Sequence, residues 1–175
     1  MAQQATRRLN AELRAGASTT HDMPTISSNE ASKPNPALAP LAALVGDWDT
    51  VGSHPMIPGT LHGRATFAWM EGGAFLIMRT TVDQPQVPSG LAIFGSDDET
   101  GALYMLYFDE RGVSRKYDVK WDAGALRWWR DAPGFSQRYV TTIAGDGRTM
   151  ASRGELCRDG ATWEQDLVLA YTRVA

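Results

Sequence analysis

Apolar residues occupy every second position between 113 and 121, except that Arg115 takes one of these places, and the positions between them are all polar. A period of two puts alternate side chains on opposite faces of a β-strand. We therefore predict a strand here with one buried face. Arg115 lies on that face, where a charged group needs a partner.

Similar β-prone stretches recur along the chain at intervals of about 8–12 residues, a spacing typical of an antiparallel sandwich or barrel. No long helical pattern separates them, which argues against a parallel α/β sheet. A single helical turn is predicted over 40–45. Turn signals that contain glycine delimit ten predicted strands: 47–53, 61–69, 74–82, 91–96, 102–109, 113–121, 125–131, 135–143, 148–157 and 162–173.

Ten hairpin-linked strands in an open sheet would leave two edges with unpaired backbone groups, and closure into a barrel removes both edges. About eight strands already leave room for a small ligand inside a barrel. We therefore expect an all-β protein with a single antiparallel up-and-down β-barrel of about ten strands and an interior cavity. A short helical turn precedes the first strand.

The first 36 residues differ from the rest, because they contain no aromatic residue and only one of the seventeen glycines. Such a segment buries too little apolar surface to offset the entropy of ordering it. We expect residues 1–36 to form a disordered or weakly helical tail and residues 37–175 to form the barrel domain.

Charge and cysteine content exclude several classes of protein. The net charge of −3 argues against binding to nucleic acid through phosphate contacts. A single cysteine, Cys157, excludes an internal disulfide and a zinc cluster built from cysteines. No apolar run approaches about 18 residues, so we expect no membrane span. No secretory signal or cofactor motif is visible, so we predict a cytoplasmic protein without cofactor or metal; a homodimer stays open.

The inner faces of three neighbouring strands suggest a small-molecule site. If residues 123 and 124 form the next turn, Trp121 faces Leu126, Val119 faces Trp128 and Tyr117 faces Arg130. Apolar walls with a few polar groups are typical of ligand sites, and arginine fits a carboxylate, a carbonyl or a phenol. The predicted ligand-binding residues are Arg115, Tyr117, Trp128, Arg130, Gln137 and Tyr139. The alternative is an internal polar network with Asp109, Glu164 or Asp166 that only supports the barrel.

His54 and Tyr117 are the candidate catalytic residues. His54 lies in the segment 52–59, which we expect to form a loop across one end of the barrel, where a histidine can act as a base. Glu164 and Asp166 are two residues apart on the last strand, and neighbouring carboxylates can produce a general acid. Such pairs belong more often to a solvated face, which is the interpretation we favour.

The segment Leu44-Val45-Gly46-Asp47-Trp48 resembles the opening of calycin-type barrels, in which a helical turn leads into a Gly-x-Trp motif. In lipocalins an arginine near the end of the last strand packs over this tryptophan and closes the base of the barrel. The resemblance therefore implies structural roles for Trp48 and Arg173.

Two further segments, 67–76 and 107–113, resemble bacterial lipocalin-like or fatty-acid-binding-like proteins of unknown function. A more distant resemblance is to nitrobindins, ten-stranded barrels that bind haem through a histidine near the C-terminus. No histidine follows His62 in this sequence, so we expect no haem site of that type.

These observations lead to one main functional hypothesis, the binding of a small hydrophobic or aromatic molecule in the cavity without haem. The alternative is a cofactor-free isomerase or cyclase that shapes a flexible substrate by proximity. Arg115 or Tyr117 would then polarise a carbonyl and His54 would move a proton. A third possibility is a structural module with a filled core whose tail does the binding. The sequence leaves open whether the protein is an enzyme.

Overall fold

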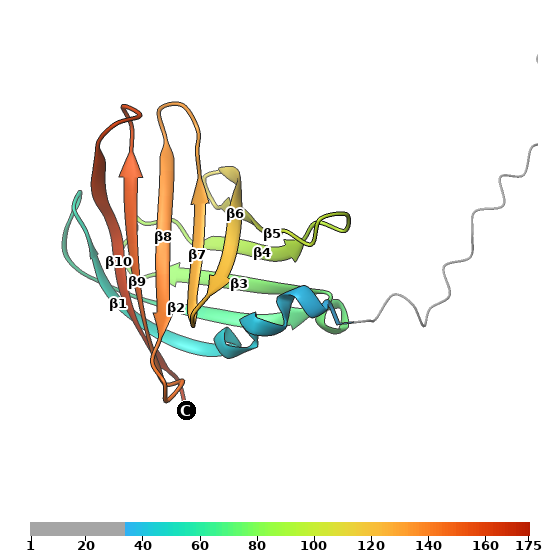
Figure 1. Ribbon diagram of the computed structural model, residues 1–175. Coiled ribbons are helices and arrows are strands. Elements are labelled where there is room, and N and C mark those ends of the chain that lie inside the picture. The colour runs from blue at the N-terminus through green and yellow to red at the C-terminus, as the bar shows by residue number, and fades with distance from the viewer. Residues whose placement is uncertain (1–33) are drawn as a thin grey trace, which may run out of the picture. The chain divides into compact units, whose positions relative to one another are not determined.

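The computed structural model describes residues 34–175, which form a closed barrel of ten antiparallel strands (Figure 1). Each strand pairs with the next one along the chain, and β1 also pairs with β10, which closes the sheet. The predicted up-and-down barrel is therefore confirmed. The strands are β1 (Gly46–His54), β2 (Ile57–Met70), β3 (Phe75–Val82), β4 (Gly90–Ser96), β5 (Leu103–Asp109), β6 (Ser114–Asp122), β7 (Ala125–Arg130), β8 (Ser136–Ile143), β9 (Thr149–Cys157) and β10 (Trp163–Arg173).

The predicted helical turn is a longer 3-10 helix, η1 (Pro36–Leu44), and a second short one, η2 (Glu71–Gly73), joins β2 to β3. The side chain of Asn35 caps η1 by accepting a hydrogen bond from the backbone N–H of Ala37. A 3-10 helix has three residues per turn, so buried leucines at every third position share one face. These are Leu38, Leu41 and Leu44. Neither helix within residues 34–175 is long and apolar enough to span a membrane.

The predicted tail lies mostly outside the described residues, since only residues 34–36 of it are described. Asn35 already belongs to the barrel: its backbone N–H donates to the carbonyl of Gly73 and its side-chain amide donates to Ser96. Contacts with the barrel are therefore already present two residues before the predicted start of the domain.

One end of the barrel is closed by η1, Trp48 and Arg173. Trp48 is fully buried and donates its indole N–H to the carbonyl of Leu44, at 2.8 Å. The Arg173 guanidinium lies over the Trp48 ring, 4.1 Å from its centroid, and donates to the carbonyls of Ala43 and Val45. These contacts join the last strand to the helix and the first strand.

The turn between β6 and β7 determines which residues of these strands face each other. Ala123 and Gly124 both have positive φ angles, 48° and 77°, as a two-residue type I′ turn requires. This turn pairs Val119 with Trp128 and Trp121 with Leu126, so these two predicted pairs are confirmed, whereas the ladder ends at Asp118 and Trp129 before the predicted pair of Tyr117 with Arg130.

A β-bulge in β10 corrects the predicted position of Asp166. Gln165 pairs with Glu155 and Val168 pairs with Arg153, so β10 has one residue more than β9 between these pairs. The extra residue shifts the alternation of side chains, and Asp166 is only 6% exposed. The prediction of a solvated face was therefore wrong for Asp166, because it assumed a regular strand. Glu164, before the bulge, is exposed.

The segment around His54 also differs from its prediction. Strand β1 continues to His54 and β2 begins at Ile57, so only Pro55 and Met56 lie outside the paired strands. The predicted loop across the end of the barrel is instead a tight turn at its rim. His54 is the last residue of β1 and pairs with Ile57.

Candidate functional site

The barrel encloses a cavity of about 550 Å³, within the range of about 300–1,000 Å³ that is usual for small-molecule sites. It reaches the end of the barrel where the turns β1–β2, β3–β4, β5–β6, β7–β8 and β9–β10 gather, which we call the mouth. Each of these turns contributes a lining residue: Met56, Val87, Arg111, Phe135 and Arg158. Much of the inner wall is aliphatic, including Leu61, Met78, Met105, Leu156 and Leu169.

Five of the six predicted ligand-binding residues line this cavity, namely Arg115, Tyr117, Trp128, Gln137 and Tyr139. The candidate catalytic residue His54 lines it as well. Arg130 is not among the lining residues; it lies at the end of β7, where it pairs with Gln137. The barrel thus brings most of the predicted site together, and the role of these residues in binding stays a prediction.

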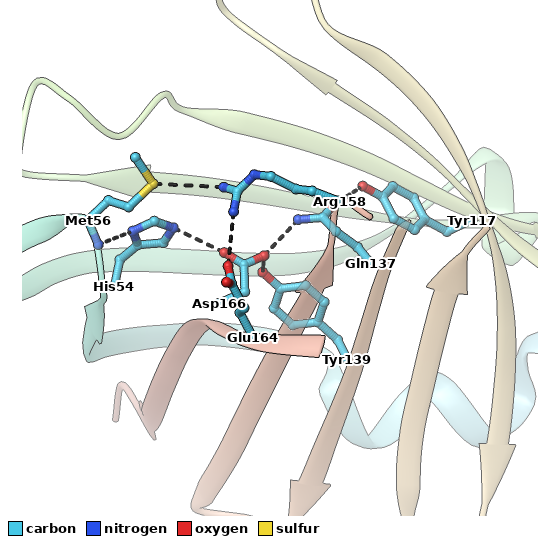
Figure 2. A network of polar contacts seen from close by, with 8 residues as sticks. All are labelled: His54, Met56, Tyr117, Gln137, Tyr139, Arg158, Glu164 and Asp166. Carbon is cyan, nitrogen blue, oxygen red and sulfur yellow. Dashed lines mark hydrogen bonds and ion pairs between the residues drawn. The ribbon is translucent and has the colours of Figure 1, made fainter. Parts of the chain in front are cut away.

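Asp166 is the centre of a buried hydrogen-bond network in the cavity wall (Figure 2). Its Oδ2 accepts hydrogen bonds from the Gln137 amide at 2.7 Å and from the Tyr139 hydroxyl at 2.9 Å. Its Oδ1 lies 3.0 Å from Nε2 of His54. The Tyr117 hydroxyl donates to the side-chain oxygen of Gln137 at 2.6 Å, which extends the network across the wall.

Both ring nitrogens of His54 are engaged. The backbone N–H of Met56 donates to Nδ1 at 3.1 Å, so this nitrogen holds a lone pair and the ring proton lies on Nε2. Nε2 therefore donates to Asp166. In this arrangement His54 holds the carboxylate and presents no free nitrogen to the cavity, so action as a base requires one of these two contacts to break.

The buried tyrosines of the network are held in their neutral, donating form. Burial raises the pKa of Tyr139 well above its usual value of 10.0, and the negative charge of Asp166 raises it further. Burial also raises the pKa of Tyr117, although the polar contact of its hydroxyl with Arg115 and the positive charges of Arg115 and Arg130 oppose this effect. Both hydroxyls therefore keep their protons at neutral pH and act as hydrogen-bond donors.

Aromatic packing keeps these side chains in place. The rings of Trp128 and Tyr139 are stacked, with centroids 3.9 Å apart and planes 9° from parallel. Tyr117 meets Trp128 edge to face at 4.9 Å. On β9, Gly154 pairs with Tyr139 and leaves no room between backbone and ring for even a Cβ atom. The stack thus depends on a glycine opposite the bulge of β10.

Arg115 is the cation of the cavity that has no carboxylate partner. Its guanidinium lies over the ring of Phe135, 4.1 Å from the centroid. Within residues 34–175 no carboxylate oxygen lies close enough to form an ion pair with it. The predicted partners are engaged elsewhere, because Asp109 binds Arg111 at 2.7 Å and Glu164 binds Arg158 at 3.1 Å.

The histidines of the described chain do not fit the haem ligation that the nitrobindin resemblance implies. A haem-binding histidine needs one free ring nitrogen, whereas both nitrogens of His54 are hydrogen-bonded. The side chain of His62 is exposed. Within residues 34–175 no group of three or more metal-ligating side chains comes together.

Asp166 is the site residue whose predicted position was wrong. The sequence allows it as one possible partner of an internal network, but the regular alternation predicts that it lies on the solvated face. A regular period of two puts Asp166 on the same face as Glu164, and no feature of the strand itself marks the bulge. Gly154 on the facing strand is the nearest signal, since an interior strand glycine often accompanies a bulge or a close approach.

Comparison with known proteins supports the fold. No family model matches the chain. The curated proteins yield no match either. Among solved structures, the chain is similar to the crystal structure of Rv2717c from M. tuberculosis, with a TM-score of 0.59 and 15% identity. The match covers 82% of this chain and 100% of that one, and at this identity it shows a shared barrel architecture.

Proposed function

We propose that the protein binds a small hydrophobic molecule, aliphatic or aromatic, inside its barrel and without haem. The observation that supports this most directly is the cavity of about 550 Å³ with aliphatic walls, in which Arg115 has no ion-pair partner among residues 34–175. Transfer of apolar ligand surface from water into such a cavity contributes about 25 cal/mol per Å². Polar groups on one part of the wall then orient the ligand.

We further propose that the chain is a calycin-type barrel, related to the bacterial lipocalin-like proteins that its sequence resembles, and that it acts in the cytoplasm. The stacking of Arg173 on Trp48 supports the first part, because this pair closes the base of lipocalin barrels. With its base closed, the barrel leaves the mouth as the route by which a ligand enters.

The direct test is native mass spectrometry of the purified protein, followed by extraction and identification of any bound molecule. We expect a non-covalent adduct of small mass that dissociates on unfolding. A second test uses the neutral dye N-phenylnaphthylamine, whose fluorescence rises in apolar surroundings. We expect the dye to bind the wild-type protein and to be excluded by Met78→Trp, because a larger side chain at this lining position fills the cavity.

The matched control is Arg79→Trp, which places the same ring on the neighbouring residue, whose side chain is exposed on the opposite face of β3. This variant should bind the dye like the wild type. Circular dichroism verifies that both variants are folded. If the folded wild-type protein binds no dye, or if both tryptophan variants bind it equally well, the cavity is not the binding site.

A cofactor-free isomerase or cyclase is the second candidate. The observation that favours it is the contact of His54 with Asp166 on the cavity wall, since a histidine held by a carboxylate can move a proton once its contact with the backbone of Met56 breaks. Its test is to incubate the protein with the molecule identified in the extract and to search for an isomer of equal mass. Conversion that is lost in His54→Ala and kept in His21→Ala supports this candidate, and equal rates in both variants remove His54 from the mechanism.

A further inference from the structure

We propose that the ligand of the cavity carries a single negative charge and binds with its charged group at the mouth, beside Arg115, and with its apolar part further inside. This inference rests on the proposed binding function and names the chemical class and the orientation of the ligand. Most charged side chains that line the cavity are neutralised within the protein. The charge that is not neutralised indicates which class of ligand fits.

Four arginines line the cavity, and three of them are neutralised within the protein. Arg111 pairs with Asp109 at 2.7 Å and Arg158 pairs with Glu164 at 3.1 Å. The third pair joins Arg64 to Asp49 at 3.2 Å. Arg115 alone among these four has no ion-pair partner in the part of the chain that the structure describes. One positive charge is thus left for a ligand.

The carboxylate of Asp166, the acidic group of the lining, does not require a cationic ligand. Its two oxygens already accept three hydrogen bonds, from His54, Gln137 and Tyr139. Three neutral donors disperse the negative charge, so the carboxylate is satisfied without a cation.

Most hydroxyl donors near Arg115 are already used. The Tyr117 hydroxyl donates to Gln137 and the Tyr107 hydroxyl donates to Asp109. On this part of the wall, the guanidinium of Arg115 is therefore the charged group that can donate hydrogen bonds to a ligand. Its planar group, held against the ring of Phe135, can form two parallel hydrogen bonds to a carboxylate, a sulfonate or a similar oxyanion.

The position of Arg115 along its strand determines the orientation of the ligand. Arg115 is the second residue of β6, directly after the β5–β6 turn at the mouth. Met78, Met105 and Leu169 lie further from the mouth and pack in or against the hydrophobic core. An amphipathic anion can therefore bury its apolar part among these side chains while its charged group stays near water.

A pair of dyes tests this inference. Anilinonaphthalene sulfonate is a monoanion, and N-phenylnaphthylamine is the same skeleton without the sulfonate. Fluorescence titration gives the Kd of each dye for the wild-type protein and for Arg115→Gln. We expect Arg115→Gln to weaken the binding of the sulfonate by about tenfold, the usual order for one charged hydrogen-bonded pair, and to leave the neutral dye unaffected.

Two further variants serve as controls. Arg115→Lys keeps the positive charge but loses the planar pair of donors, so its affinity for the sulfonate should lie between that of Arg115→Gln and that of the wild type. Arg127→Gln removes an exposed cation from the neighbouring strand β7, and its binding of both dyes should equal that of the wild type. Circular dichroism again verifies folding.

The possible failures are distinguishable. If Arg115→Gln binds the sulfonate as tightly as the wild type does, or weakens both dyes equally, the anionic class is wrong while binding in the cavity stands. If the folded wild-type protein binds neither dye, both this inference and the proposed function fail.

Discussion

The carboxylate of Asp166 accepts a hydrogen bond of 2.9 Å from the hydroxyl of Tyr139, although β9 lies between their strands. The contact crosses the inner surface of the barrel and does not follow the backbone ladder. The same carboxylate also contacts His54 on β1, so it connects the first strand, the eighth and the last. The contacts of Asp166 therefore hold these three strands together beside the mouth of the cavity.

This network predicts that Asp166 contributes strongly to stability. Replacement of Asp166 by alanine leaves the buried donors of Gln137 and Tyr139 without an acceptor, which should lower the free energy of unfolding by about 2–4 kcal/mol. Urea denaturation measures this change. The control is Glu164→Ala, which removes an exposed carboxylate two residues earlier and should cost less than about 1 kcal/mol. Equal losses in the two variants would contradict a structural role for the network.

The close approach of Gly154 to Tyr139 predicts that this glycine tolerates no side chain. In Gly154→Ala the new Cβ atom would overlap the ring, so the ring must move away from its stack on Trp128. We expect a loss of about 1–3 kcal/mol in the free energy of unfolding, as for other overpacked cores. The matched control is Gly145→Ala in the β8–β9 turn, where a Cβ atom meets no neighbour. If Gly154→Ala is as stable as Gly145→Ala, the packing argument is wrong.

The buried tyrosines predict a loss of stability in alkali. Burial raises the pKa of Tyr107 and of Tyr171 to about 12, from a usual value of 10.0. Above about pH 10 the unfolded chain releases protons that the folded protein keeps, so rising pH favours unfolding. These two side chains should leave the free energy of unfolding unchanged below about pH 10 and lower it progressively between about pH 10 and 12.

Urea titrations over this pH range, together with the ultraviolet absorbance of tyrosinate, check this prediction. In Tyr107→Phe the free energy of unfolding should fall less steeply with rising pH, because one tyrosine fewer releases its proton on unfolding. An unchanged dependence in this variant would show that Tyr107 does not contribute.

Local patterns in the sequence were sufficient to predict the strands and most of the predicted site residues that line the cavity. The alternation of apolar and polar residues and the glycine turns located all ten strands, because both signals depend on neighbours in the chain. The turn at Ala123 and Gly124 also determined which residues of β6 and β7 face each other. The sequence was therefore sufficient to place Tyr117 and Trp128 on one inner face.

The predictions of a solvated Asp166 and of a loop at 52–59 were wrong where the pairing of two neighbouring strands departs from a regular ladder. The bulge of β10 lies in its pairing with β9, and the pairing of β1 with β2 shifts between Gly52 and His54 before the tight turn that joins them. A period of two within one strand contains no information about such mismatches.

The sequence by itself determined the strand order, the turns and the charges, since each follows from short-range geometry and composition. Only the tertiary structure decided which charges meet. Asp166 turned inward to three neutral donors, while Arg115 was left beside a phenyl ring without a carboxylate. The physical reason is that electrostatic pairing depends on distances through space, and closure of the barrel sets these distances.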